Sequence, residues 1–209
     1  FSFYPTKHIT TMEGGMLISH LEKHSSLVRK ISAFGYTKSL EERLVPGIYD
    51  IDQLGYNFRM SEVSAAIGVE QLKKLKLFIK TRNSNALIIR EELKTNKNLK
   101  VLPAQYGKSM SSNFCVNIVL KFGSSEKRNK LIMKLKEKNI GTSVHYPVSI
   151  PGSLYYKNKL KDINESYPIA EYFAKNSISL PCGPHITEEE VKGMCKVFIE
   201  MMEEEFLWF

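Results

Sequence analysis

The most informative residues open the chain, in the run Phe1-Ser2-Phe3-Tyr4-Pro5-Thr6-Lys7-His8-Ile9-Thr10-Thr11-Met12-Glu13-Gly14-Gly15. Here Lys7 follows residues of strand type and precedes a Gly14-Gly15 turn. A lysine held on a short connection and partly removed from water loses part of its preference for the charged form, and the neutral amine can attack a carbonyl. The run therefore makes Lys7 a candidate for Schiff-base chemistry, although a lysine beside a turn is also a common surface residue.

Ser2 lies five residues before Lys7 and is a candidate phosphate ligand. A hydroxyl at the end of a strand can donate to a phosphate, as anion sites built from strand-to-helix turns do. After the Gly-Gly turn, residues 15–19 are apolar and predict a short strand, and the apolar spacing over 21–34 predicts a helix.

The composition is that of an ordinary globular protein, with 43% hydrophobic and 25% charged residues among 209. This length allows one domain or a pair of small ones, and the composition argues against disorder. No apolar run approaches the roughly 20 residues needed to cross a bilayer, so we expect a cytoplasmic setting without a membrane partner. Because the chain opens on Phe1 and not on methionine, we also expect it to be a fragment or a trimmed product.

The three cysteines, Cys115, Cys182 and Cys195, are odd in number and far apart. They form no C-x-x-C pair, so the sequence indicates neither a disulfide framework nor a zinc site, and we expect no metal.

The net charge of +8 raises the possibility of nucleic-acid binding. The lysines are scattered, however, and the densest group, residues 73–76, lies on an amphipathic helix whose polar side would carry them anyway. We therefore favour a solvated helix face. Nucleic-acid binding is kept as a distant alternative, which predicts affinity that falls steeply with added salt. Failure of the chain to be retained on a heparin or DNA column at low salt would exclude it.

The pattern of the chain changes after about residue 97. Residues 38–56 contain Pro46, Gly47 and Gly55 with little periodicity and predict a long irregular excursion over the surface or into a neighbour. The further predictions are helices over 59–93, 125–138 and 167–177 and strands over 100–102, 114–122, 141–146 and 178–180.

The last helix has the clearest sequence signal. Thr187 followed by Glu190 forms a capping box at its start. Apolar residues then fall on one face through Phe206, which predicts a packing face and not a binding groove.

The opening run resembles the lysine motif of the DegT/DnrJ/EryC1/StrS aminotransferases, whose pattern is roughly F-S-F-x-x-x-K-x-x-T-x-x-E-G-G. These enzymes use pyridoxal 5'-phosphate (PLP) to aminate keto sugars attached to nucleotides. The resemblance implies that Lys7 is the Schiff-base lysine and that Ser2 contacts the cofactor phosphate. Relatives that dehydrate the sugar carry histidine at the lysine position, so Lys7 implies transamination.

A second match is Gly55-Tyr56-Asn57-Phe58-Arg59-Met60, which resembles the family's G-Y-N-x-R-M segment. In the family this segment crosses a dimer interface, which implies that Asn57 helps to bind the cofactor phosphate of the other subunit. Arg59 either contributes to binding, as a substrate contact, or braces the loop. From the residues alone, Asn57 could equally be an Asx turn or a helix cap. One departure is Phe34, where many members have histidine.

A third match, residues 139–147, resembles the family's G-I-x-x-x-x-H-Y-P strand and loop. It implies that His145 and Tyr146 face the substrate, and histidine is suited to proton transfer near neutral pH. A lone histidine at a strand end is also often structural. The Ser179-Leu180-Pro181 segment resembles the family's S-L-P and supports the alignment without adding chemistry.

The resemblance implies an α/β chain, the C-terminal part of a PLP-transferase (aspartate aminotransferase-like) fold. Its parts would be the end of the large domain with the interface loop (1–58), a long linking helix region (59–97) and a small C-terminal α+β domain (98–209). The first half of such an enzyme, which in the family supplies the aspartate on the pyridine nitrogen, is not in this sequence.

The resemblance also implies a function for the longer parent enzyme. This is transamination of a nucleotide-linked keto sugar, with an amino-acid donor such as glutamate, by a homodimer in polysaccharide or antibiotic sugar synthesis. The alternative is a naturally truncated, inactive remnant or a partner-binding module, for which borohydride would trap no PLP on Lys7.

Overall fold

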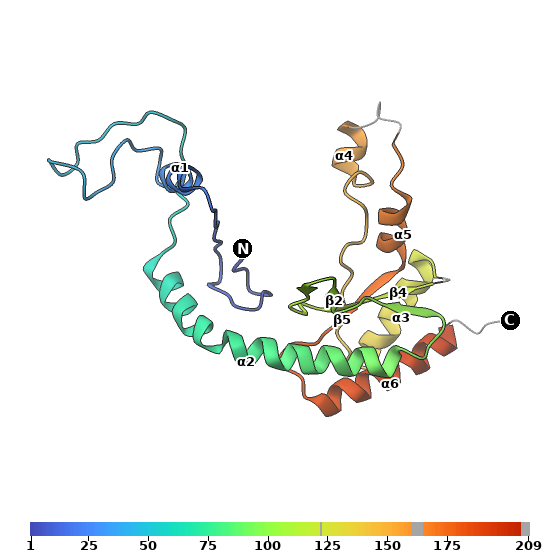
Figure 1. Cartoon of the computed structure of the whole chain (residues 1–209). Coiled ribbons are helices and arrows are strands. Elements are labelled where there is room, and N and C mark those ends of the chain that lie inside the picture. The colour runs from blue at the N-terminus through green and yellow to red at the C-terminus, as the bar shows by residue number, and fades with distance from the viewer. Residues whose placement is uncertain (122, 160–164, 206–209) are drawn as a thin grey trace. The chain divides into compact units, whose positions relative to one another are not determined.

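The computed structural model describes residues 1–121, 123–159 and 165–205 (Figure 1). It divides into two units, Phe1–Leu75 and Lys76–Phe209. The boundary falls within one long helix, α2 (Glu62–Leu93). No helix in the described part of the chain is long and apolar enough to span a membrane.

The first unit begins with a narrow loop closed by backbone hydrogen bonds. The amide of Phe3 donates to the carbonyl of Gly14, and that of Met16 donates to the carbonyl of Phe1, both at 3.0 Å. The predicted strand over residues 15–19 is wrong, because the pairing stops at the isolated bridge between Ser2 and Gly15. A strand needs a ladder of such bonds, and the pairing ends after this one bridge.

Helix α1 (Glu22–Ser32) follows, as predicted, and residues 33–61 then form an irregular excursion. Isolated bridges join Ala33 to Asn57 and Tyr36 to Ile51, so the loop returns to the end of α1. An ion pair between Lys30 and Asp52 ties the loop to the helix a second time.

Helix α2 begins beyond Ser61, whose hydroxyl accepts from the Ser64 amide at 3.1 Å. Sequence patterning predicts an apolar stripe along its first half, but burial is confined to the second half. Val63 is 69% exposed and Leu72 is 59% exposed, whereas Ile89 and Leu93 are buried. Within the described residues, some apolar side chains of the first half are therefore left exposed, whereas Ile67 and Leu75 are half-buried.

The second unit contains a three-stranded antiparallel sheet in the order β1-β4-β5. Its strands are β1 (Leu99–Val101), β4 (Val116–Leu120) and β5 (Ser177–Leu180), close to their predicted positions. Phe122, in the predicted range of β4, lies outside the described residues. A short hairpin of β2 (Gln105–Tyr106) and β3 (Ser109–Met110) was not predicted.

The described residues of this unit also form the helices α3 (Ser125–Glu137), α4 (Leu154–Lys159), α5 (Pro168–Asn176) and α6 (Glu188–Glu205). All but α4 were predicted. The capping box before α6 is confirmed, because the Glu190 amide donates to the Thr187 hydroxyl at 3.2 Å and the Thr187 amide donates to the Glu190 carboxylate at 2.7 Å. Phe206, in the predicted apolar face, lies outside the described residues.

One face of the sheet carries the apolar core. Alternate residues of β4 and β5 pack with α2, α3 and α6, and the fully buried members include Ile89, Ile118, Leu131, Ile178 and Phe198. The other face of β4 and β5 carries Asn117, Val119, Ser177 and Ser179. A strand was predicted over 141–146, but only Ser143 pairs, by an isolated bridge to Ser179.

Buried polar side chains of α2 hold the loops at the ends of β4 and β5. The Arg82 guanidinium donates to the carbonyl of Phe114 at 2.9 Å. The Asn85 amide donates to the carbonyls of Gly183 at 3.2 Å and Ile186 at 3.1 Å. Because these carbonyls are taken out of water, their pairing with α2 fixes where both loops lie.

Candidate functional site

Lys7 ends a tight turn within the opening loop. Its amide donates to the carbonyl of Tyr4 at 2.9 Å, and its side chain is half-buried. Across the loop, the Phe3 carbonyl accepts from both the Thr10 hydroxyl (2.9 Å) and the Thr11 amide (3.0 Å). The lysine is thus carried on a short segment whose two ends are bonded to each other.

Thr11 is the buried centre of this loop, at 3% exposure. Its hydroxyl donates to the carbonyl of Glu13 at 2.7 Å. A Cβ atom at Gly14 would lie 2.6 Å from that hydroxyl, and one at Gly68 of α2 would lie 2.9 Å from the Thr11 methyl. Gly14 also has a φ of +148°, a conformation that favours glycine. The loop therefore needs the part of the lysine motif that contains Thr11 and Gly14 for its own packing.

Ser2 lies on the strand-like side of the same loop, exposed to solvent. Its hydroxyl oxygen accepts from the Tyr4 amide at 3.3 Å. Because the oxygen is used as an acceptor, the hydroxyl hydrogen can be directed to an anion. Ser2 and Lys7 thus lie on the same short loop, and their roles stay a prediction.

Asn57 and Arg59 form a pair at the end of the irregular excursion. The Arg59 Nε donates to the Asn57 Oδ1 at 3.2 Å, and the guanidinium carbon lies 4.9 Å from the centre of the Phe34 ring. Asn57 is not a helix cap, because Ser61 caps α2. The helix-cap alternative for Asn57 is therefore wrong. Its side-chain oxygen instead orients Arg59, and its amide hydrogens remain available as donors.

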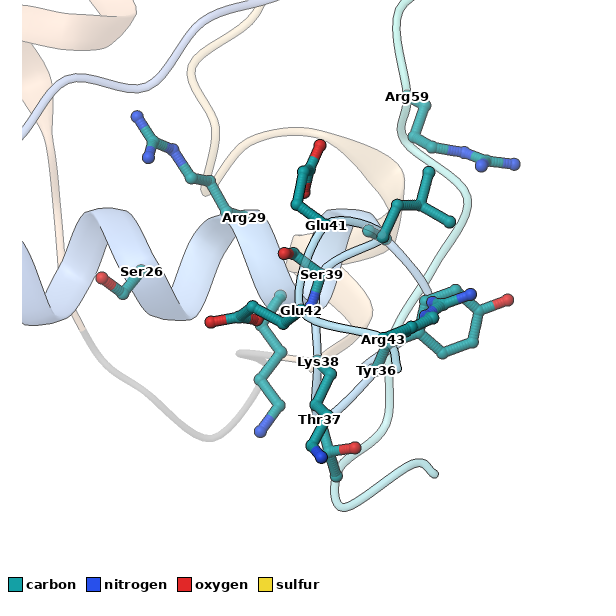
Figure 2. Close-up of a pocket in the computed structure, with 13 residues that line it drawn as sticks. Ser26, Arg29, Tyr36, Thr37, Lys38, Ser39, Glu41, Glu42, Arg43 and Arg59 are labelled. Carbon is teal, nitrogen blue, oxygen red and sulfur yellow. Dashed lines mark hydrogen bonds between the residues drawn. The ribbon is translucent and has the colours of Figure 1, made fainter. Parts of the chain in front are cut away.

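Arg59 also lines a pocket of about 640 Å³ between the end of α1 and residues 36–43 (Figure 2). Five basic side chains and two acidic ones line it, and the basic ones are Arg29, Lys30, Lys38, Arg43 and Arg59. The Arg43 guanidinium lies 4.7 Å from the Tyr36 ring and 5.0 Å from the Tyr49 ring. This excess of positive charge suits an anionic ligand.

His145 and Tyr146 belong to the second unit. The His145 ring is half-buried, and its Nδ1 lies 2.9 Å from the Ser179 hydroxyl and 3.9 Å from the Cys115 sulfur. Tyr146 is 71% exposed, and its ring stands edge-on to His145 with centroids 5.6 Å apart. The structure thus gives His145 a fixed environment and leaves Tyr146 on the surface.

Sequence reasoning missed two residues behind His145. Ser179 is 2% exposed, and its hydroxyl donates to the Asn117 side-chain oxygen at 2.5 Å. Ser179 belongs to the S-L-P segment, which was treated as chemically silent, and Asn117 was read only as part of a strand. The sequence signal that could have found them is a polar residue within each of two otherwise apolar strands, because a buried polar side chain needs a hydrogen-bond partner.

Beside them, burial raises the pKa of the Cys115 thiol. The thiol therefore remains protonated at neutral pH.

An aminotransferase family is the class of protein to which the fold and these motifs point. A model of the DegT/DnrJ/EryC1/StrS aminotransferase family matches residues 1–198, and the chain belongs to this family. The expected family is thereby confirmed.

Two curated relatives show the range of activities in the family. A GDP-4-keto-6-deoxy-D-mannose 3-dehydratase of Yersinia pseudotuberculosis is 37% identical and aligns with 94% of this chain and 52% of its own length. A UDP-4-amino-4,6-dideoxy-N-acetyl-beta-L-altrosamine transaminase of Campylobacter jejuni is 29% identical and aligns with 97% of this chain and 52% of its own length. The chain thus spans about half the length of the curated relatives it matches.

Solved structures agree with the fold. Helicobacter pylori PseC, an aminotransferase involved in the biosynthesis of pseudoaminic acid, superimposes with a TM-score of 0.85 at 26% identity, over 97% of this chain and 52% of PseC. The E. coli GDP-4-keto-6-deoxy-D-mannose-3-dehydratase with bound hydrated PLP gives a TM-score of 0.77 at 27% identity, over 95% of this chain and 53% of the dehydratase. These likenesses confirm the predicted fold class, the C-terminal part of a PLP-transferase.

Proposed function

We propose that the chain is part of a longer PLP-dependent enzyme that transfers an amino group, with glutamate as donor, to a nucleotide-linked keto sugar. The observation that carries this proposal is the placement of Lys7 on a loop held shut by Thr10 and Thr11. Membership of the family and the PLP bound in a solved relative support it.

The residues of the loop fit PLP. The half-buried Lys7 and the exposed Ser2 hydroxyl share one short loop, so one can hold the aldehyde end of the cofactor and the other its phosphate. Asn57, with amide donors available, would add a phosphate contact, in the family manner from the other subunit. When bound, PLP supplies an electron sink for charge that develops on the carbon beside the amino group.

The proposed work of Lys7 has two parts. Its Nζ would hold the cofactor until an amino donor displaces it, and the freed amine would then move a proton between the two carbon atoms that flank the transferred nitrogen. A side chain on a loop with bonded ends keeps its position through both steps, and such positioning lowers the entropic part of the barrier.

The pocket beside Arg59 supports a nucleotide-linked substrate. A nucleotide sugar carries a diphosphate, and an Arg59 side chain oriented by Asn57 over Phe34 presents donors suited to phosphate oxygens. His145 and Tyr146 would contact the sugar, the first as a proton acceptor or donor and the second through its exposed hydroxyl.

The exposed apolar residues of the excursion support a homodimer of the parent enzyme. Leu44 is 94% exposed, Leu54 76% and Phe58 70%, and large apolar side chains left exposed on one segment are typical of a surface that another chain covers. A cytoplasmic setting for this dimer stays a prediction.

Borohydride trapping tests the proposal in the full-length parent. The protein is incubated with PLP, reduced and digested, and the lysine that carries a phosphopyridoxyl group is found by mass spectrometry. We expect the label on Lys7 and its loss in Lys7→Arg, whereas Lys23→Arg, at an exposed position of α1, keeps it. Label spread evenly over the lysines and unchanged by Lys7→Arg would show that the Lys7 loop holds no cofactor, as expected of an inactive remnant.

The product of the same enzyme separates transamination from dehydration. With glutamate and a nucleotide-linked keto sugar, both reactions convert glutamate to 2-oxoglutarate. Transamination leaves the nitrogen on an amino sugar, whereas dehydration gives a deoxy keto sugar and releases the nitrogen as ammonia, because the two electrons that reduce the sugar carbon come from glutamate. Formation of the deoxy sugar alone would rule out transamination while leaving Lys7 trapping intact.

A further inference from the structure

We infer that Ser179 and Asn117 are positioning residues that hold His145 in one tautomer, with the hydrogen on Nδ1 and the lone pair on Nε2. The inference rests on the proposed function in so far as His145 is proposed to face the substrate. The geometry that carries it is a chain of hydrogen bonds from His145 through Ser179 to Asn117.

The register of three segments places these residues together. Ser179 on β5 pairs with Asn117 on β4, and on its other side it pairs with Ser143, two residues before His145. Paired residues of neighbouring strands point to the same face, so the two side chains lie on the face opposite the apolar core. The backbone bonds between Ser143 and Ser179, at 2.8 and 3.1 Å, bring His145 over this face.

The donors and acceptors around His145 assign its imidazole hydrogen to Nδ1. The Ser179 hydroxyl donates to the Asn117 Oδ1 at 2.5 Å, and the Cys115 thiol donates to the same oxygen at 3.4 Å. Both hydrogens are therefore used, and what the hydroxyl and the sulfur present to His145 are lone pairs. Nδ1 lies 2.9 Å from the hydroxyl oxygen and must then be the donor.

The consequence is that Nε2, and not Nδ1, is the ring nitrogen of His145 that is available to a ligand. In a neutral imidazole the hydrogen bond made by one nitrogen decides the state of the other, so Nε2 becomes the proton acceptor. The ring is also held by edge contacts with Phe114, at a centroid distance of 5.9 Å, and with Tyr146. Nε2 is thus prepared to accept a hydrogen bond or a proton from a sugar hydroxyl without first exchanging tautomers.

Strand β5 provides a matched control. Ser177 lies two residues from Ser179 on the same face and is equally buried, at 3% exposure. Within the part of the chain that the structure describes, its hydroxyl has no hydrogen-bond partner. Ser177→Ala therefore removes the same atom from the same strand without touching the His145 chain.

The tautomer can be read directly by long-range ¹H–¹⁵N NMR of the imidazoles in the full-length parent at a pH where His145 is neutral. A His145→Gln spectrum assigns the signal. We expect the hydrogen on Nδ1 in the wild type and in Ser177→Ala, and a mixture of tautomers in Ser179→Ala and Asn117→Leu. A wild-type His145 with the hydrogen on Nε2 overturns the inference, whatever the activity, and this reading of the wild type does not depend on the folding of Ser179→Ala or Asn117→Leu.

Steady-state kinetics of the same variants test whether the tautomer of His145 matters for the reaction. Loss of one neutral hydrogen bond predicts that kcat/KM for the nucleotide sugar falls about two- to tenfold in Ser179→Ala, with no change in Ser177→Ala. Equal losses in the two variants would also overturn the inference. If the tautomer is as expected but His145→Gln leaves kcat/KM unchanged, the positioning chain stands and the proposed contact of His145 with the substrate fails.

Discussion

Gly35 and Gly55 pack backbone against backbone: a Cβ atom at Gly55 would lie 2.0 Å from the Gly35 nitrogen, and one at Gly35 would lie 2.1 Å from the Gln53 carbonyl oxygen. Gly35 also has a φ of +74°. Around this contact, the Tyr56 amide donates to the Ile31 carbonyl at 2.7 Å and the Phe58 amide to the Ser32 carbonyl at 2.9 Å. The glycine of the G-Y-N segment is therefore what lets the excursion return to the end of α1.

Gly55→Ala is expected to separate these two backbones. Since the overlapping atoms are backbone atoms that cannot rotate away, the cost in unfolding free energy exceeds about 1 kcal/mol. Hydrogen exchange would show faster exchange of the Tyr56 and Phe58 amides, and urea unfolding would show a lower midpoint. Gly141→Ala is the control, because a Cβ atom there meets open space. Equal protection in Gly55→Ala and the wild type would contradict the close packing.

The Thr11 hydroxyl is expected to stabilise the Lys7 loop. Thr11→Val keeps the shape of the side chain but leaves the Glu13 carbonyl without its 2.7 Å hydrogen bond, which costs about 1 kcal/mol. We expect a lower Tm and slower borohydride trapping of PLP at Lys7. Thr6→Val, at an exposed position of the same loop, should leave both unchanged. Trapping that is as fast in Thr11→Val as in the wild type would separate loop closure from cofactor capture.

The Phe34 ring is expected to support Arg59 in binding the nucleotide. A cation–π contact at an exposed site contributes about 0.5–1 kcal/mol, so Phe34→Leu should raise the KM for the nucleotide sugar about two- to fivefold with little change in kcat. Phe34→Tyr keeps the ring and is expected to behave like the wild type. Both variants share the φ of +65° at this position, so backbone strain does not distinguish them. A KM that is the same for leucine and tyrosine would show that the ring does not act through Arg59.

The sequence predicted the helices and strands that are determined by residues close together in the chain. The capping box before α6, the apolar periodicity of α1 and α3 and the short apolar strands β4 and β5 were all found close to where the sequence placed them. Predictions failed where an element depends on a partner. Residues 15–19 and 141–146 have strand composition, but each pairs through one bridge, and composition does not count the partners available to a strand.

The candidate site divides in the same way. The sequence placed Lys7 and Ser2 on one loop because they are five residues apart, and the Asn57–Arg59 contact is likewise local. Ser179 and Asn117 are 62 residues apart, and only the register of β4 and β5 brings their side chains to 2.5 Å. A contact of that kind follows from strand pairing and cannot be obtained from a local motif.

The capping box gives a pH dependence with a defined sign. Hydrogen bonds from the Thr187 amide, and secondarily from its hydroxyl, lower the pKa of Glu190 below its ordinary value of 4.5. The unfolded chain therefore binds this proton more readily, so the stabilisation is complete above the unfolded pKa and is lost as pH falls from about 4.5 through the lower folded value.

Thr187→Ala should cost about 1 kcal/mol at pH 7, as other N-cap replacements do. Urea unfolding of the wild type and Glu190→Gln between pH 7 and 3 would check the sign. The difference between them should shrink at the acid end, and a difference that grows toward low pH would contradict the assignment.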